Sequence, residues 1–365
     1  MNINSTSTEN TTTWTNAYWT INNENVFLEA LEGAKDLIGD DYDQFKAEAK
    51  FVRALCYYYL NNLYSQPYSL DPNAKSVPLR LTPQKGTDDN NKPRSTVKAV
   101  YEQILEDLKE YNSLPNGELS ETGVSRATKG AANMLRMRVY MAMENWGEAI
   151  TAGELVTGYS LAGNVASLFK TPYYTTETIF SLPMAISNTP NTQQGLAEYY
   201  ADEKILIVDD VNGIMSKANY SLPDDARSAF KDAKKKLVKF TDVATKLDWV
   251  PIFRYAETLL DLAECYANTT GGEGTAKELL KRVRYRSLPE DVDPLDIDAL
   301  SGDGLKEAIY NEKRLEFIGE GIRGIDIIRR GENFVQGKRV TSPQNSGYIW
   351  PIPQAEQLIN KDLNK

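Results

Sequence analysis

The chain has 365 residues, 41% of them hydrophobic, and a formal net charge of −10 at pH 7. This charge disfavours nucleic acid and anionic lipid headgroups as partners, because both are polyanions. The sequence contains no histidine, which excludes histidine-dependent nucleophiles and histidine-ligated zinc and leaves carboxylate, lysine or tyrosine chemistry.

The chain starts with the polar segment MNINSTSTENTTTW. It has neither the basic region nor the apolar region of a signal peptide. No apolar run in the sequence approaches the roughly 20 residues that span a bilayer. We therefore expect a soluble chain, or one whose targeting segment has been removed.

Helical periodicity recurs along the chain in pairs of segments joined by short turns. The first pair covers about residues 44–112, with Pro67 ending its first helix and Ser95 as the expected N-cap of its second. The spacing of aromatic and small residues across the turns resembles a tetratricopeptide hairpin, in which two antiparallel helices interlock. Three further pairs are expected at about residues 125–157, 252–286 and 303–331.

Between the second and third pairs, at about residues 159–248, helical periodicity is missing. The segment mixes turn residues with short β-favouring runs at 178–180 and 205–208. Loops on a rigid scaffold usually carry binding. We expect one all-α domain over residues 1–365, with tetratricopeptide-like hairpins and an irregular region of loops and short strands that forms the ligand face.

A set of motifs in fixed order identifies a family resemblance. In chain order they are WTNAYWTINNENVFL, FKAEAKFVRALCYYYLNNLY, RSTVKAVYEQILEDLKEYNSLP, RATKGAANMLRMRVYMAMENWGEAI, FRYAETLLDLAECYAN, NEKRLEFIGEGIRGIDIIRRG and YIWPIPQAEQLINKDLNK. From Trp14 to the C-terminus they resemble the SusD/RagB family of outer-membrane nutrient-binding lipoproteins of Bacteroidota.

The resemblance implies an all-α protein that is lipid-anchored at the outer surface of the outer membrane. It implies binding of a glycan, or of a peptide in some members, and delivery to a SusC-like TonB-dependent transporter. It implies no cofactor and no catalysis. Trp14 corresponds to a position well inside full-length members, so we expect a signal peptide and a lipidated cysteine upstream of this sequence.

Two tyrosine doublets in the irregular region are the candidate ligand contacts. Tyr173, Tyr174, Tyr199 and Tyr200 lie among Thr, Asn and Gln residues where no helical period demands burial. Aromatic rings stack on the C–H faces of sugars, and the Tyr hydroxyl can hydrogen-bond. Packing or plain exposure stays open for each doublet, and Trp249 is expected to be a packing residue.

Two motifs suggest other chemistry, and each has a structural interpretation that we favour. Gly319-x-Gly321-x-x-Gly324 has the spacing of a dinucleotide fingerprint, but it follows an expected helix instead of a strand, so a helix-ending turn is predicted. The acidic segment 291–304 fails the EF-hand register, so we expect an acidic surface loop, with a looser cation site left open.

Carboxylates and arginines concentrate near the end of the chain. Glu316 and Glu320 are four residues apart on one expected helix, as two glycosidase carboxylates could be. Because four arginines lie nearby in sequence, at 314–330, we expect instead an arginine–carboxylate network that locks the last hairpin. Arg254 and Glu257, three residues apart, are expected to form an ion pair on a helix.

The two cysteines, Cys56 and Cys265, lie in apolar helical patterns and are expected to be buried small hydrophobic residues. A disulfide between them stays open. For function, three alternatives remain beside glycan capture: peptide binding, a cytoplasmic tetratricopeptide scaffold for a protein partner, and a carboxylate glycosidase. No catalytic or metal-binding residue is assigned.

Overall fold

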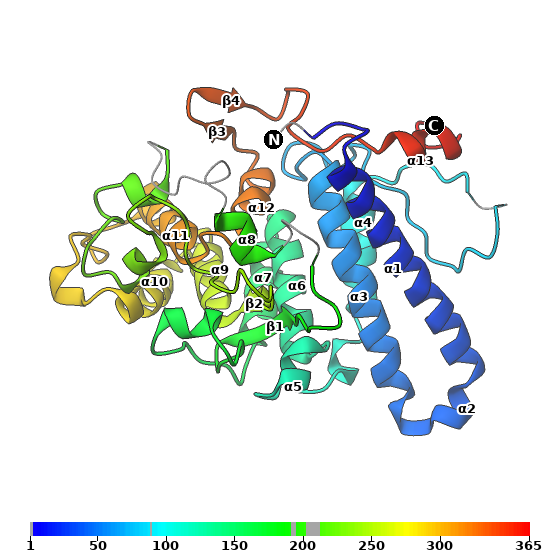
Figure 1. The fold of residues 1–365 in the computed structure, drawn as a ribbon, viewed down its shortest axis with the longest axis horizontal. Helices are drawn as coiled ribbons and strands as arrows, with labels where there is room; N and C mark the ends of the chain where they lie inside the picture. The colour runs from blue at the N-terminus through cyan, green and yellow to red at the C-terminus, as the bar shows by residue number, and fades with distance from the viewer. Residues whose placement is uncertain (1–2, 88–89, 191–194, 202–211) are drawn as a thin grey trace. The chain divides into compact units, whose positions relative to one another are not determined.

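The computed structural model describes residues 3–87, 90–190, 195–201 and 212–365, and it is mostly helical, as predicted (Figure 1). The α-helices are α1 (Thr8–Gly33), α2 (Lys35–Ile38), α3 (Tyr42–Tyr64), α4 (Val97–Asp107), α5 (Glu121–Ser125), α6 (Lys129–Ala142), α7 (Trp146–Glu154), α8 (Leu196–Ala201), α9 (Tyr255–Ala267), α10 (Glu273–Ser287), α11 (Gly302–Glu316), α12 (Ile322–Arg329) and α13 (Gln354–Ile359). The strands are β1 (Thr178–Leu182), β2 (Val250–Arg254), β3 (Phe334–Gln336) and β4 (Arg339–Thr341).

Backbone contacts divide the chain into two compact units. Unit 1 comprises Met1–Pro115, Ala127–Asn145 and Gly324–Lys365, and unit 2 comprises Asn116–Arg126 and Trp146–Arg323. The single domain expected over residues 1–365 stays a prediction.

In unit 1 the first predicted hairpin is found as α3 and α4, which pack against each other. The N-cap of α4 is Thr96, whose Oγ1 accepts a hydrogen bond from Ala99 N at 3.1 Å. The cap therefore lies one residue beyond the predicted Ser95. The core of this unit is rich in tyrosine, and Tyr57, Tyr58 and Tyr64 are fully buried there.

Helix α1 packs beside α3 (Figure 1) and was not among the helices predicted from the sequence. Its sequence is rich in Thr and Asn and has no clear apolar face. Its buried residues mix apolar side chains (Trp14, Ile21 and Leu31) with asparagines. The buried Asn25 donates to Arg80 O at 3.0 Å and accepts from Arg53 Nη1 at 2.7 Å. Because asparagines occupy part of the buried face, the apolar residues of this helix do not show a clear helical periodicity in the sequence.

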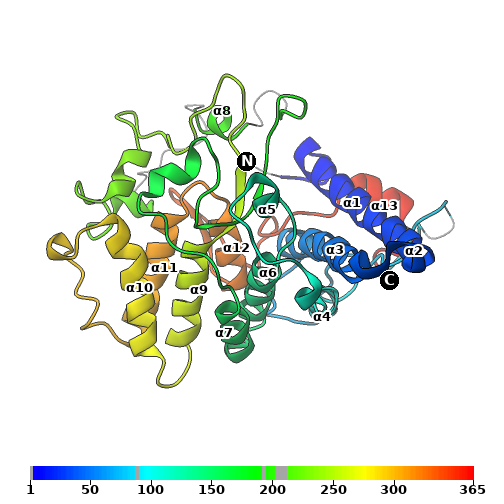
Figure 2. The same ribbon diagram turned by 90° about the horizontal axis from the view of Figure 1, so that it is seen from below.

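In unit 2, α9 packs against α7, α10 and α11, and Figure 2 shows α9 beside α10. The predicted hairpin at 252–286 is found as α9 and α10. The predicted hairpins at 125–157 and 303–331 are also pairs of helices, α6 with α7 and α11 with α12, although a unit boundary falls within each pair.

The irregular region contributes one strand to a small sheet. β1 pairs antiparallel with β2, with Thr178 opposite Arg254 and Leu182 opposite Val250. The predicted β-favouring run at 178–180 thus lies in β1, while the run at 205–208 lies outside the described residues. A hydrophobic cluster anchors this region: Ala162, Val165, Leu168, Phe169, Ala197, Ile214, Met215, Tyr220, Phe230, Leu237, Phe240 and Leu315.

Both cysteines are free thiols. Cys265 is buried, as predicted, whereas Cys56 is only half-buried. The disulfide that the sequence left open is therefore not formed.

Candidate functional site

Three aromatic rings gather next to the β1–β2 sheet of unit 2. The ring centroids of Tyr173 and Trp249 are 6.2 Å apart with planes inclined by 25°, and those of Tyr174 and Trp249 are 6.0 Å apart at 34°. Trp249 is 9% exposed, whereas both tyrosines are half-buried. Trp249 therefore packs against the doublet, as expected of a packing residue, and the two tyrosines are the more exposed of the three residues.

Little space lies inside this aromatic group. Tyr173 and Trp249 line an enclosed void of 10 Å³ together with Thr178, Pro251 and Arg254, among others. A void of this size holds at most about one water molecule. A ligand at this surface would therefore rest on the outer faces of the rings, in a shallow site.

The turn that leads into Trp249 is held by two carboxylates. Asp242 accepts hydrogen bonds from two backbone N–H groups that follow it, both at 2.9 Å. Asp248 accepts one from Asp242 N at 3.0 Å. Burial raises the pKa of Tyr173, and the charges of Asp248 and Asp242 act in the same direction, so its hydroxyl keeps its proton at neutral pH.

The second doublet lies on the short helix α8, and its two rings differ in role. Tyr199 is 38% exposed. Tyr200 is half-buried, stacks on Phe240 with centroids 5.9 Å apart, and donates a hydrogen bond to Gly319 O at 2.8 Å. Burial, helped by Tyr199, raises the pKa of Tyr200 to about 12. Tyr200 thus packs against the core, and Tyr199 is the more accessible ring.

Both doublets contact the segment 240–249. The first doublet contacts it through Trp249 and the second through Phe240. An ion pair of 3.0 Å between Glu198 and Lys246 joins α8 to the same segment. Among the residues that the structure describes, no ring contact joins one doublet to the other, so the four predicted rings share a support without forming one surface.

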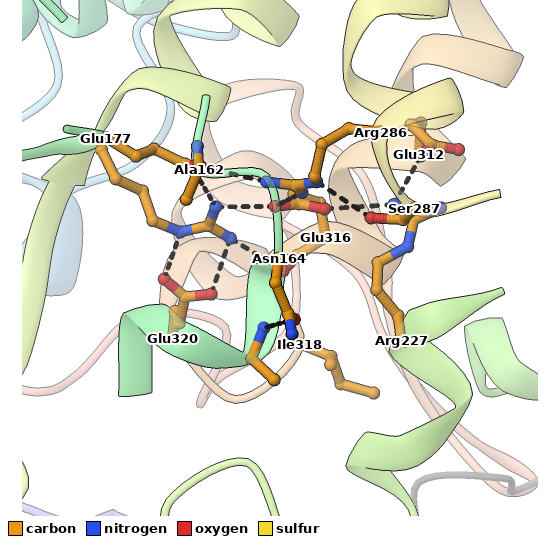
Figure 3. Close-up of polar contacts among 12 residues, drawn as sticks. Ala162, Asn164, Glu177, Arg227, Arg286, Ser287, Glu312, Glu316, Ile318 and Glu320 are labelled. Atoms are coloured by element: carbon orange, nitrogen blue, oxygen red, sulfur yellow. Dashed lines mark hydrogen bonds and ion pairs between the residues drawn. The ribbon is translucent and has the colours of Figure 1, made fainter. Parts of the chain in front are cut away.

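A buried ionic network adjoins this aromatic group, because its member Arg254 lines the same void as Tyr173 and Trp249. Figure 3 shows the network. Glu316, the last residue of α11, lies 2.6 Å from Arg254 Nη1, 2.5 Å from Arg286 Nη2 and 3.1 Å from Arg227 Nη1. Glu177 binds Arg254 at 2.6 Å and Arg286 at 3.0 Å. Because these arginines come from β2, α10 and the irregular region, the network ties that region to the helices.

Glu320 extends the network toward a buried lysine. Arg254 binds its carboxylate with two N–H groups, at 2.8 and 2.9 Å, and Lys239 Nζ lies 2.5 Å away. Burial alone would raise the pKa of Glu316 and of Glu320, but the cations around them outweigh burial and lower both pKa values, that of Glu316 strongly. Burial lowers the pKa of Lys239 to about 8, against the opposing attraction of Glu320.

The predicted arginine–carboxylate network is therefore present, but its cations differ from those expected. Those that bind Glu316 come from segments far from the last hairpin in sequence. Arg254 is the last residue of β2, so the helical spacing on which a pair with Glu257 was predicted does not apply. Its ion pairs are with Glu177, Glu316 and Glu320.

Comparison with known proteins settles the family. A SusD-like family described as "Starch-binding associating with outer membrane" matches residues 1–141, and the SusD family matches residues 171–338. The crystal structure of a SusD superfamily protein from Bacteroides fragilis is 63% identical, with a TM-score of 0.98 over 100% of this chain and 86% of that chain. The chain belongs to the SusD family.

More distant SusD relatives agree with this fold. SusD-like protein P25 of Formosa agariphila is 25% identical over 380 residues, which covers 87% of this chain and 70% of P25. A SusD superfamily structure from Bacteroides thetaiotaomicron is 22% identical with a TM-score of 0.81, over 96% of this chain and 84% of that chain. The predicted SusD-like, all-α fold is thereby confirmed.

The first two glycines of the motif in this SusD-family chain form a helix-ending turn, as predicted, whereas Gly324 lies in α12. Helix α11 ends at Glu316, and Gly319 and Gly321 follow with φ angles of +82° and +79°. A Cβ atom on Gly319 would overlap Leu237 Cδ2. The positive φ angle therefore favours glycine at 319, and any larger residue would also force Leu237 to shift.

The acidic segment 291–304 is only partly a surface loop. The side chain of Asp293 is buried and binds Arg284 through both carboxylate oxygens, at 2.5 and 2.6 Å. Within the described parts of the chain, no cluster of three or more acidic or cysteine side chains could hold a metal ion. Nor does any described helix combine the length and apolar content that a bilayer crossing requires.

Sequence reasoning missed several members of the network. Glu177 and Arg227 lie in the irregular region, where no periodicity marks a buried position. Arg286 lies in a charged stretch of α10 that looks solvated. One usable signal was Glu177 itself, a charge directly before the buried run 178–180, since a charge beside a buried strand needs a partner.

Proposed function

We propose that this chain captures an oligosaccharide at the outer surface of the outer membrane and delivers it, uncleaved, to a SusC-like TonB-dependent transporter. An N-terminal lipid would attach it to the membrane. The description of the family that matches residues 1–141, starch-binding and associated with the outer membrane, supports the ligand class and the location.

The observation that carries the proposal is the pair of half-exposed rings, Tyr173 and Tyr174, packed against the buried Trp249. Sugar rings present apolar C–H faces, and flat aromatic faces suit them. Rings that are already fixed by packing lose little conformational entropy when a ligand binds. Tyr199 is a further candidate contact because it is exposed, whereas the packing of Tyr200 favours a structural role.

The test is a calorimetric comparison of tyrosine variants. Oligosaccharides of several backbones are first screened for binding, and the best ligand is titrated into Tyr173→Ala, Tyr174→Ala and Tyr199→Ala. Loss of one stacking contact, worth about 1 kcal/mol, should weaken binding roughly five- to tenfold. Tyr285→Ala, a half-buried tyrosine on α10 of the same unit, is the matched control and should bind like the parent.

Thermal melts of each variant separate contact from folding. If Tyr173→Ala and Tyr174→Ala keep their stability and bind like the parent, the ligand does not rest on these rings. If no oligosaccharide binds and peptides do, glycan capture is wrong and the peptide alternative replaces it.

The absence of cleavage has its own support. A glycosidase acid needs a carboxyl group with a raised pKa, whereas the cations around Glu316 and Glu320 lower theirs. Glu24, on α1, does have a raised pKa, of about 7, because of burial. It is therefore the carboxyl group whose loss must also be tested for an effect on cleavage. Incubation with the bound oligosaccharide should release no reducing ends above the buffer rate; sustained release that Glu24→Gln or Glu316→Gln abolishes would contradict the proposal.

A further inference from the structure

Unit 1 contains a hollow of 690 Å³ that lies apart from the tyrosine doublets in sequence. Three segments form it: residues 3–5, the β3–β4 hairpin and residues 346–351. Its volume is within the roughly 300–1,000 Å³ of small-molecule sites.

The β3–β4 hairpin turns its polar side toward this hollow. Phe334 pairs with Thr341 and Gln336 with Arg339, and all four line the hollow. Alternate residues of a strand point to opposite faces, and the intervening pair, Val335 and Val340, is 49% and 55% exposed. The polar Gln336 and Arg339 therefore lie on the side that lines the hollow, and the two valines lie on the other side.

Aromatic rings form another part of the lining, and they are held in place. The Tyr348 hydroxyl donates to Glu332 O at 2.8 Å, and its ring lies 5.2 Å from that of Phe334. The backbone N–H of Trp350 donates to Leu63 O at 2.7 Å, and its ring packs edge-on to Tyr64 at 6.1 Å. Tyr348 is 3% exposed and supports Phe334, so the accessible rings of the lining are the half-buried Phe334 and Trp350, which are already fixed before a ligand binds.

Hydrogen bonds join the remaining walls. The side-chain amide of Asn10 donates to Asn4 O and to Pro351 O, both at 2.9 Å. Gln354 N donates to Ser5 O at 2.8 Å. The start of α1 and the C-terminal segment are thus fixed to each other, and the hollow is a built feature of unit 1.

We infer that this hollow is a second carbohydrate-binding site, for a short oligosaccharide or one end of a longer glycan. The lining joins aromatic faces, which suit sugar C–H groups, with amide, guanidinium and hydroxyl groups, which suit sugar hydroxyls. A polar hairpin face turned toward a hollow suits an occupant that hydrogen-bonds. The choice of carbohydrate rests on the proposed function, but the site does not depend on the tyrosine doublets.

Fluorine NMR on 5-fluorotryptophan-labelled protein tests this, because the tryptophans report on separate places. Each resonance is assigned by a Trp→Phe variant, and the probes are maltoheptaose, cellohexaose, xylohexaose, mannohexaose and an oligogalacturonate. Trp350 reports on the hollow, and Trp249 reports on the Tyr173–Tyr174 surface. The five tryptophans are Trp14, Trp19, Trp146, Trp249 and Trp350.

At least one probe should shift the Trp350 resonance in a saturable way. Gln336→Ala and Arg339→Ala should each weaken that response about fivefold, as expected for one lost hydrogen bond. Val335→Ala and Val340→Ala are matched controls, since they lie on the same strands with their side chains facing away, and they should leave it unchanged.

The outcomes separate this inference from the proposed function. If a probe shifts Trp249 alone, the second site is wrong and glycan capture stands. If a probe shifts Trp350 alone, with the expected loss in Gln336→Ala and Arg339→Ala, the second site stands and the tyrosine surface is wrong. A Trp350 response that neither variant weakens overturns the second site. If no probe shifts either resonance, both the second site and the proposed glycan capture are wrong.

Discussion

The Tyr200 hydroxyl donates a 2.8 Å hydrogen bond to the carbonyl oxygen of Gly319, which joins α8 to the turn after α11. Tyr200→Phe removes this bond and keeps the ring on Phe240. We expect the free energy of unfolding to fall by about 1 kcal/mol, with no change in oligosaccharide affinity. Urea titration and calorimetry measure the two quantities; the exposed Tyr199, changed to Phe, is the control for stability. Weaker binding by a Tyr200→Phe variant of unchanged stability would place this hydroxyl in the ligand site.

Two glycines of the same turn allow a matched comparison. Gly319 and Gly321 both have positive φ angles, but only at Gly319 would a Cβ atom overlap Leu237. Gly321→Ala should cost about 1–2 kcal/mol for the backbone angle alone, and Gly319→Ala should cost more. Adding Leu237→Ala to Gly319→Ala should recover the excess in a double-mutant cycle. Equal costs for the two single variants would mean that Leu237 moves aside freely.

Removal of one charge from the buried network should be costly. Glu316→Gln removes the one carboxylate that Arg227, Arg254 and Arg286 all bind, although Glu177 still binds Arg254 and Arg286. Loss of one partner from a buried ion pair typically costs about 3–5 kcal/mol. The control is Glu307→Gln. The ion pair of Glu307 with Lys217 is exposed, so its loss should lower the free energy of unfolding by less than about 1 kcal/mol. Similar urea midpoints for the two variants would show that the network contributes little to stability.

The same network predicts an acid-sensitive fold. The folded-state pKa values of Glu316 and Glu320 are lowered, relative to about 4.3 in an unfolded chain. The unfolded state therefore binds more protons as the pH falls through this range, and the stabilisation present above pH 4.3 is lost toward the folded-state pKa. Unfolding free energies from pH 6 to pH 3 should show this decline. Glu316→Gln should flatten it, and a variant curve parallel to the parent curve would contradict the assignment.

The helical part of this fold is readable from sequence because hydrophobic periodicity reports burial directly. Helices α3, α4, α9 and α11 show this periodicity, whereas in α1 the buried asparagines Asn10 and Asn25 interrupt it. The ionic network shows a second limit. Glu177 and Arg254 are 77 residues apart, and the charges alone do not say which arginine reaches which carboxylate.

The tyrosine doublets show the same limit for the site. The sequence makes Tyr199 and Tyr200 equally good candidates for ligand contact, because both lie in a segment without helical periodicity. Only the tertiary contacts with Phe240 and Gly319 reveal that Tyr200 is used for packing. The hollow of unit 1 was beyond sequence reasoning, because its walls come from both ends of the chain.

The bond between Asn10 and Pro351 spans 341 positions of the chain. Ribosomes release a protein from its N-terminus onward, so α1 must wait for 341 further residues before this partner emerges. Until then Asn10 must satisfy its amide with water or other groups, and the surfaces that line the hollow are not yet assembled. Loss of residues 346–351 would therefore disturb the start of α1 as well as the segment that is removed.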